Sequence, residues 1–170
     1  KVVPKAASFA AGISIVYITL TVIWALMLWG AGMPMFDSIA HAMTTLATGG
    51  YSTKSESLAA FNSSTIEIII IFGMLVGSLP FVHYLTLSKN GLKNLIKDDQ
   101  VKLFLTLVFF VVLIMSLYLS SNNIPYLEAL RLASFNVISI ITGTGFGTSD
   151  FSNWGGFPTT ILLILMFVGG

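Results

Sequence analysis

Hydrophobic residues gather in four long stretches of the chain. Ala6 to Trp29 contains no charged residue, and it has the roughly 20 helical residues that the hydrocarbon core of a bilayer requires. Ile66 to Leu87 and Leu103 to Leu119 are further stretches of spanning character, and Thr159 to Gly170 begins a fourth. The pattern predicts four membrane-spanning helices. Since the last one stops inside the membrane, we expect the chain to be a piece of a longer protein.

Two shorter segments lie between these stretches and are too short and too polar to cross. Met35 to Leu46 follows Pro34, and Tyr126 to Ile141 follows Pro125. Proline is favoured in the first turn of a helix, where its missing N–H leaves no hydrogen bond unmade. Both segments are therefore predicted to be short helices that enter the membrane and turn back.

Each short helix runs into a glycine-rich turn with an aromatic residue. The turns read Thr48-Gly49-Gly50-Tyr51-Ser52 and Gly143-Thr144-Gly145-Phe146-Gly147, and aligning Gly50 with Gly145 pairs the two aromatic residues. The order of span, short helix, glycine turn and span thus occurs twice. Such an internal repeat determines the predicted architecture.

Irregular backbone at membrane depth points to a path for ions. Unpaired polar groups persist there only where protein buries them or water lies beside them. Cation selectivity filters use such backbone, because carbonyl oxygens replace the hydration shell of the ion, and glycine tolerates the backbone angles involved. The aromatic residues are expected to wedge the loops against the helices. The candidate ion ligands, mainly through backbone carbonyls, are Thr48, Gly49, Gly50, Tyr51, Gly143, Thr144, Gly145 and Phe146.

The ends of the short helices support the same interpretation. A helix carries about half a negative charge at its C-terminus, and these C-termini, near Leu46 and Ile141, are predicted to point at the glycine turns. That arrangement favours a cation partway across the membrane.

Composition agrees with a membrane location and excludes other classes. Hydrophobic residues make up 55% of the chain, charged residues 9%, and mean hydropathy is +0.91, whereas soluble domains carry roughly 25% charged residues. The chain has no cysteine, and its net charge of +1 argues against nucleic acid as a partner. The sequence offers no nucleophile–base pair, carboxylate dyad or metal-ligand cluster, so we expect neither an enzyme nor a cofactor.

Basic residues predict the orientation. Six of the eight lie on one side of the predicted spans, and the positive-inside rule makes that side cytoplasmic. The loop from Lys89 to Lys102 is then cytoplasmic, and both glycine turns open to the outside. The basic residues concerned are Lys1, Lys5, Lys89, Lys93, Lys97 and Lys102. The outer side carries more acids than bases: Asp37, Glu56, Glu67, Glu128 and Asp150 against Lys54 and Arg131.

Four polar residues near the predicted pore have ordinary structural interpretations. His41 is expected to be a packed or water-facing polar residue rather than a metal ligand, and His83 is expected to make a local hydrogen bond. Glu128 and Arg131 are three residues apart on one short helix, a spacing that favours an ion pair.

Two stretches, Ala40 to Thr53 and Ile141 to Trp154, resemble the bacterial Trk/Ktr/HKT superfamily of potassium transporters. The likeness extends over essentially the whole chain and is greatest to the TrkH membrane subunits. By this resemblance the chain covers about two of four repeats. Residues 1–88 match the second repeat, 89–102 a cytoplasmic linker, and 103–170 most of the third.

The resemblance implies a fold and a function. The fold is an all-α membrane protein, with repeated span–re-entrant pore helix–filter loop–span units around a pseudo-fourfold pore. Gly50 and Gly145 match the filter glycines, and neither is the serine associated with sodium preference in plant relatives, which favours potassium as the transported ion. Gly169 and Gly170 match the approach to a gating loop. The implied partners are the lipid bilayer of the inner (plasma) membrane, the remaining repeats, a second copy in a homodimer and a cytosolic nucleotide-binding TrkA-type ring.

Several alternatives remain open at this point. The ion could be sodium, or the pathway non-selective for cations, and two-repeat chains could form a homodimeric channel. A secondary carrier would also use broken helices, but it would direct helix N-termini at its site, whereas C-termini are predicted here. A purely structural membrane subunit would use the glycines for helix packing alone.

Overall fold

The computed structural model describes residues 3–90, 95, 97–149 and 151–169. Lys1, Lys93, Asp150 and Gly170, and parts of the predicted linker, lie outside the described residues. The described regular structure is helical, as predicted. The α-helices are α1 (Val3–Gly30), α2 (Met35–Leu46), α3 (Ser64–Ser78), α4 (Phe81–Asn90), α6 (Asp99–Ser121), α7 (Tyr126–Ile141) and α8 (Gly156–Gly169), and two 3₁₀ helices are η1 (Ser57–Phe61) and η2 (Phe151–Trp154).

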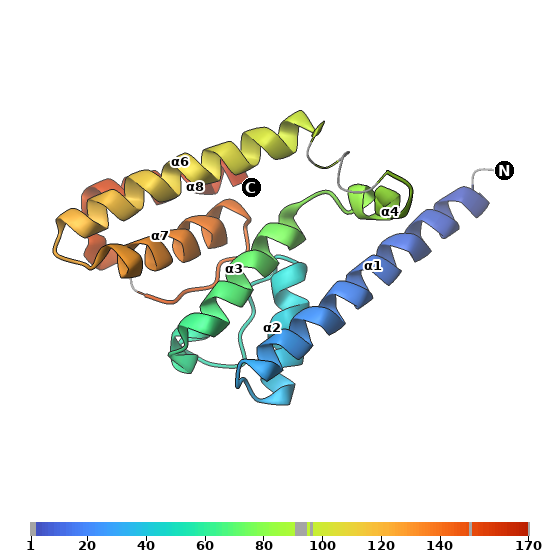
Figure 1. Ribbon diagram of the computed structural model, residues 1–170, viewed down its shortest axis with the longest axis horizontal. Helices are drawn as coiled ribbons and strands as arrows, with labels where there is room; N and C mark the ends of the chain where they lie inside the picture. Colours follow the sequence, from blue (N-terminus) through green and yellow to red (C-terminus); the bar gives the residue numbers. More distant parts are fainter. Residues whose placement is uncertain (1–2, 91–94, 96, 150, 170) are drawn as a thin grey trace.

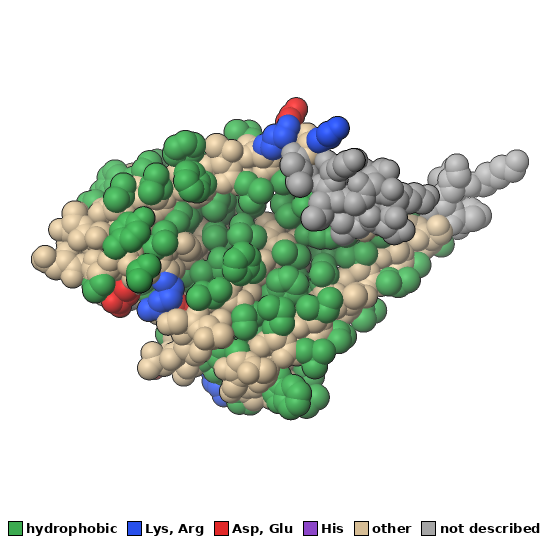
Figure 2. Space-filling model, viewed as in Figure 1, with side chains coloured by type: hydrophobic (Ala, Val, Ile, Leu, Met, Phe, Trp, Pro, Cys, Tyr) green, Lys and Arg blue, Asp and Glu red, His purple; other side chains and the backbone are tan. Residues whose placement is uncertain are grey.

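Within the described residues, two helices are long and apolar enough to cross a membrane. They are Ala6–Gly30 of α1, with a mean hydropathy of 2.1, and Asp99–Ser121, with 2.6. The apolar helices α3 and α8 are shorter. Few of the residues in the two long helices are buried inside the chain, so their outer surfaces are available to lipid or to other parts of a larger protein. Figure 2 shows hydrophobic side chains over much of one face, with charged groups near its edges.

The prediction of one continuous helix from Ile66 to Leu87 is wrong. Helix α3 ends at Ser78, Leu79 is extended (φ −77°, ψ 148°), and α4 begins after Pro80. Proline removes a backbone donor and disfavours the helical conformation in the residue before it. The second predicted span therefore consists of two helices joined by a break.

The helices form two neighbouring groups with the glycine turns between them (Figure 1). Helices α1 and α3 pack around α2, and α6 and α8 pack around α7. Helix α3 also contacts α7, so it joins the two groups. The two short helices are thereby held by long apolar helices, in equivalent settings.

Glycines allow the outer helices to approach the ends of α2 and α7. A Cβ atom on Gly77 of α3 would lie 2.7 Å from the carbonyl oxygen of Leu46, the last residue of α2. On Gly169 of α8 it would lie 2.0 Å from the carbonyl oxygen of Ile141, the last residue of α7. The same backbone contact therefore fixes both short helices at the ends that face the glycine turns.

A polar contact joins α4 to the start of α6. His83 Nε2 lies 2.8 Å from a carboxylate oxygen of Asp98, whose other oxygen accepts hydrogen bonds from the N–H groups of Gln100 and Val101. These backbone hydrogen bonds hold the pKa of Asp98 below its usual value. The predicted local role of His83 is thus confirmed, and Asp98 is the N-cap of α6.

Candidate functional site: two glycine turns at the ends of short helices

Both short helices have the predicted bounds. Each begins after a proline in an extended conformation (Pro34, φ −53° and ψ 143°; Pro125, φ −53° and ψ 136°) and ends directly before its glycine turn. The proline sets the start because its ring fixes φ, and the turn sets the end because positive-φ residues interrupt the helix. The negative ends of both helix dipoles consequently point toward the turns.

The two turns share a pattern of positive φ at matching positions. Thr48 and Gly143 hold equivalent places and have φ of 49° and 71°, while Gly50 and Gly145 have φ of 65° and 82°. Positive φ is costly for a β-branched residue such as threonine. Positive φ at these two places is therefore a shared feature of both turns, and Thr48 adopts it although it is not a glycine.

Hydroxyl groups of the short helices anchor both turns at matching positions. Thr44 Oγ donates a 2.9 Å hydrogen bond to the carbonyl oxygen of Tyr51, and Ser139 Oγ donates a 2.7 Å hydrogen bond to that of Phe146. The two aromatic carbonyls are thus directed toward their own helices. Within the described part of the chain no donor binds the other carbonyls of the turns, which belong to Thr48, Gly49, Gly50, Gly143, Thr144 and Gly145.

The two turns are in direct contact with one another. A Cβ atom on Gly50 would lie 1.8 Å from the carbonyl oxygen of Thr144, so only glycine fits there. Gly147 is held from the first half of the chain: its N–H donates to Ser57 Oγ and its carbonyl accepts from the N–H of Leu58, both at 3.2 Å. The second turn is therefore positioned partly by η1, which follows the first turn.

The aromatic residues of the turns differ in their surroundings. Phe146 is 3% exposed and packs within the core, as expected of a wedge. Tyr51 is 78% exposed, so the prediction that it wedges its loop against helices of this chain is wrong. Its carbonyl is held by Thr44, but its ring lies on the surface.

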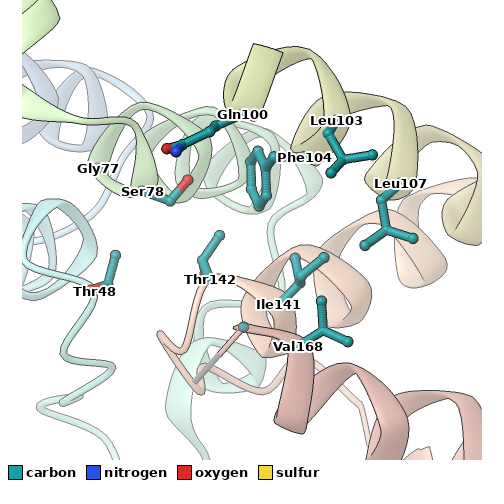
Figure 3. A pocket seen from close by; sticks show the side chains of 11 residues that line it. Thr48, Gly77, Ser78, Gln100, Leu103, Phe104, Leu107, Ile141, Thr142 and Val168 are labelled. Atoms are coloured by element: carbon teal, nitrogen blue, oxygen red, sulfur yellow. The ribbon is translucent and has the colours of Figure 1, made fainter. Parts of the chain in front are cut away.

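A cavity of about 490 Å³ lies beside the ends of both short helices (Figure 3). Thr48, Ile141 and Thr142 reach it from the two helix ends, and α6 contributes Gln100 and Phe104 across from them. The remaining lining residues are Gly77, Ser78, Leu103, Leu107, Val168 and Gly169. Two negative helix ends therefore border a space lined by apolar and neutral polar side chains.

The site offers oxygens without carboxylate clusters. Among the described residues, no group of three or more His, Asp or Glu side chains could hold a metal ion. The oxygens available at the turns are peptide carbonyls and threonine hydroxyls, and Thr142 Oγ and Thr144 Oγ lie 2.8 Å apart. Such neutral oxygens suit a weakly held, passing cation.

Sequence reasoning missed three polar contacts near the turns. Arg131 of α7 pairs with Glu67 of α3 rather than with Glu128. Asp37 accepts a 2.6 Å hydrogen bond from Thr53 and lies 3.3 Å from Lys54. The third contact joins His41 Nε2 to Ser52 Oγ at 2.9 Å. Charge spacing along a single helix cannot reveal a partner on another helix, and the Glu67 partner of Arg131 was missed for that reason.

Comparisons with known proteins agree with this architecture. Residues 3–170 match the family described as TrkH, cation transport protein. The chain is 37% identical to the Trk system potassium uptake protein TrkH of Salmonella typhimurium and 36% identical to that of Escherichia coli K12. Both matches cover the whole chain and 36% of the relative. The crystal structure of the potassium transporter TrkH from Vibrio parahaemolyticus superimposes with a TM-score of 0.92 at 31% identity, over 98% of this chain and 37% of that one.

Two short helices thus end at glycine turns between apolar helices, with the negative ends of their dipoles at the turns. The chain spans about 36% of the length of the curated relatives it matches. It belongs to the TrkH family of cation transport proteins, which are transporters and not enzymes.

Proposed function

We propose that the parent of this chain takes up potassium across the cell membrane, and that the two glycine turns form half of its selectivity filter. The observation that carries the proposal is the matching backbone of the turns, whose carbonyls before each aromatic residue have no donor within the described residues. The Trk relatives named above are potassium uptake proteins, which supports the choice of ion.

The chemistry of the turns supports potassium more than sodium. Carbonyl oxygens can replace the hydration shell of a weakly hydrated cation without the charge of a carboxylate. Glycine occupies both key places, Gly50 and Gly145, and by the resemblance it is a serine at such a place that accompanies sodium preference in plant relatives. A sodium or non-selective pathway is the second candidate, and competition between the two ions separates them.

The proposed setting follows the resemblance. Residues 1–88 and 103–170 would be two repeats joined by a linker at 89–102 on the cytoplasmic side, with the turns open to the outside of the inner membrane. The remaining repeats of the parent would complete the ring, because two turns cannot surround an ion. A homodimer of the parent and a TrkA-type cytosolic ring are proposed on resemblance alone.

The other classes have less support. A carrier that binds an anion would aim helix N-termini at its site, whereas α2 and α7 end at the turns. A purely structural subunit would leave the repeated hydroxyl-to-carbonyl anchors of Thr44 and Ser139 without a purpose. A channel of two-repeat chains differs from a four-repeat protein in the length of its reading frame.

The deciding experiment is potassium uptake by a transport-deficient bacterium that expresses the full-length parent. We expect growth at low potassium and uptake that a large excess of sodium reduces only slightly. Equal competition by sodium would favour the non-selective pathway. Membrane insertion without any cation flux would rule out the proposed function.

Replacing Gly145 with valine is expected to reduce potassium-over-sodium discrimination about tenfold, since left-handed backbone costs a residue with a Cβ roughly 1–2 kcal/mol. Gly145 has φ +82°, and a Cβ there would meet nothing within 4 Å, so the effect is conformational. The measurement is the ratio of uptake rates for the two ions in the full-length protein.

Gly147→Val is the matched control for this substitution. A Cβ at Gly147 also meets nothing within 4 Å, but its φ lies outside the left-handed range. We expect its ratio of uptake rates to stay within about twofold of wild type, because no left-handed strain is added. Unchanged discrimination in Gly145→Val would count against a filter at the second turn.

A further inference from the structure

His41 is a buried polar residue on α2 that the proposed function does not use. Its side chain is 0% exposed, and its two ring nitrogens both have partners. Nδ1 lies 2.7 Å from the carbonyl oxygen of Asp37, and Nε2 lies 2.9 Å from Ser52 Oγ. Because a carbonyl can only accept, Nδ1 carries the proton, and in the neutral ring Nε2 accepts the hydroxyl proton of Ser52.

Ser52 is the residue that follows Tyr51 in the first turn, so His41 ties that turn to the middle of its own helix. The Ser52 hydroxyl oxygen also accepts a 3.1 Å hydrogen bond from the N–H of Lys54. The direction of donation is therefore fixed for every hydrogen bond in this chain of groups. The ring orientation and the path of the backbone after the turn are fixed together.

The same ring also contacts the second turn. The His41 and Phe146 rings lie 5.9 Å apart, centre to centre, at an interplanar angle of 30°. The His41 ring also lies 5.3 Å, centre to centre, from the ring of Phe61 in η1, at 89°, in an edge-to-face arrangement. Phe146 is the aromatic residue whose carbonyl Ser139 anchors. One side chain thus holds Ser52 of the first turn by a hydrogen bond and Phe146 of the second by stacking.

The second repeat has a corresponding hydrogen bond from the short helix to its loop, but no aromatic ring at that position. Asn136 of α7 occupies the place that aligns with His41. Its Nδ2 donates to the carbonyl oxygen of Leu132 at 2.9 Å and to Ser149 Oγ at 3.4 Å. A buried polar side chain at this place therefore ties the loop to the short helix in both repeats. The imidazole of His41 in addition contacts the neighbouring turn through Phe146.

We propose that His41 is a positioning residue for ion selectivity, which sets the two glycine turns at a fixed spacing through Ser52 and Phe146. This rests on the proposed function, because it assigns a role within the same filter. Selective sites must hold their ligands within about 0.5 Å of the productive geometry. A rigid ring that contacts both turns provides that restraint at the junction of the two repeats.

The test separates the two contacts in the full-length parent. His41→Phe keeps an aromatic ring beside Phe146 but loses the acceptor for Ser52, and His41→Gln keeps an acceptor but loses the ring. Phe146→Leu removes the stacking partner from the other side. Ser38→Ala is the matched control, because Ser38 is equally buried on α2 but hydrogen-bonds only to the carbonyls of Met33 and Pro34.

We expect both His41 variants to lower the potassium-over-sodium ratio of apparent affinities about tenfold, the factor that corresponds to one buried hydrogen bond or ring contact. The maximal potassium rate per folded protein should change less, and Ser38→Ala should keep the wild-type ratio. Adding Phe146→Leu to His41→Gln should reduce the ratio no further, since the contact is already gone.

Three outcomes are informative. If the wild-type parent shows no potassium flux, the proposed function is wrong, regardless of the behaviour of the His41 variants. A selective wild type whose two His41 variants keep the same ratio overturns the positioning role alone. Variants that do not reach the membrane folded are replaced by Ser52→Ala, which breaks the tether without altering the core, and an unchanged ratio there also overturns it.

Discussion

Alanine at position 50 is expected to abolish cation transport by the full-length protein. Gly50 has φ +65°, and a Cβ there would lie 1.8 Å from the carbonyl oxygen of Thr144 and 2.9 Å from its carbon. Left-handed backbone alone costs roughly 1–2 kcal/mol. The clash adds to this, because the opposing atoms belong to backbone that Ser139 and η1 hold in place. We expect a loss of at least about 100-fold in uptake rate, which corresponds to about 2.7 kcal/mol.

The neighbouring glycine provides the control. A Cβ on Gly49 would make only ordinary contacts, the nearest at 3.6 Å to the Tyr51 ring, and its φ is outside the left-handed range. Gly49→Ala should therefore transport at close to the wild-type rate. Both variants are compared by potassium uptake and by the amount of protein that elutes as a single species after membrane extraction. Wild-type uptake by Gly50→Ala would mean that the turns do not touch in the parent.

Local signals were sufficient to predict the short helices. Pro34 and Pro125 mark their starts, the glycine turns mark their ends, and the structure has both boundaries where the sequence put them. The second span was mispredicted because hydrophobicity alone was followed through Pro80, whose effect on Leu79 breaks the helix. Here a local signal was present and was outweighed by the apolar pattern.

The candidate site was predicted as residues but not as contacts. Alignment of the two repeats makes Gly50 equivalent to Gly145. It would also have made Thr44 equivalent to Ser139, and the hydroxyls of these two residues anchor the aromatic carbonyls. The contact between Gly50 and Thr144 depends on how two repeats meet in space. No spacing along the chain encodes that distance, and the exposed position of Tyr51 has the same origin.

The partner of Arg131 also lies in the other repeat, where spacing along the chain does not reveal it. Glu67 of α3 and Arg131 of α7 belong to different repeats, and their side chains are 8% and 26% exposed. Arg131→Ala should lower the stability of the folded protein by about 3 kcal/mol or more, because removing one member of a buried pair leaves the other charge uncompensated. Thermal unfolding of the purified full-length protein measures the change.

Three further variants decide whether the pair itself is responsible. Glu67→Ala should destabilise to a similar degree. Glu128→Ala should have little effect, although Glu128 lies one helical turn before Arg131 on α7. The exchanged pair, Glu67→Arg with Arg131→Glu, should regain most of the stability that each single reversal loses, since the coupling between contacting charges is not additive. A large loss from Glu128→Ala with little loss from Glu67→Ala would instead assign Arg131 to its own helix. The contact between α3 and α7 would then depend on apolar packing alone, and the second turn would be held to the first repeat by η1 and His41.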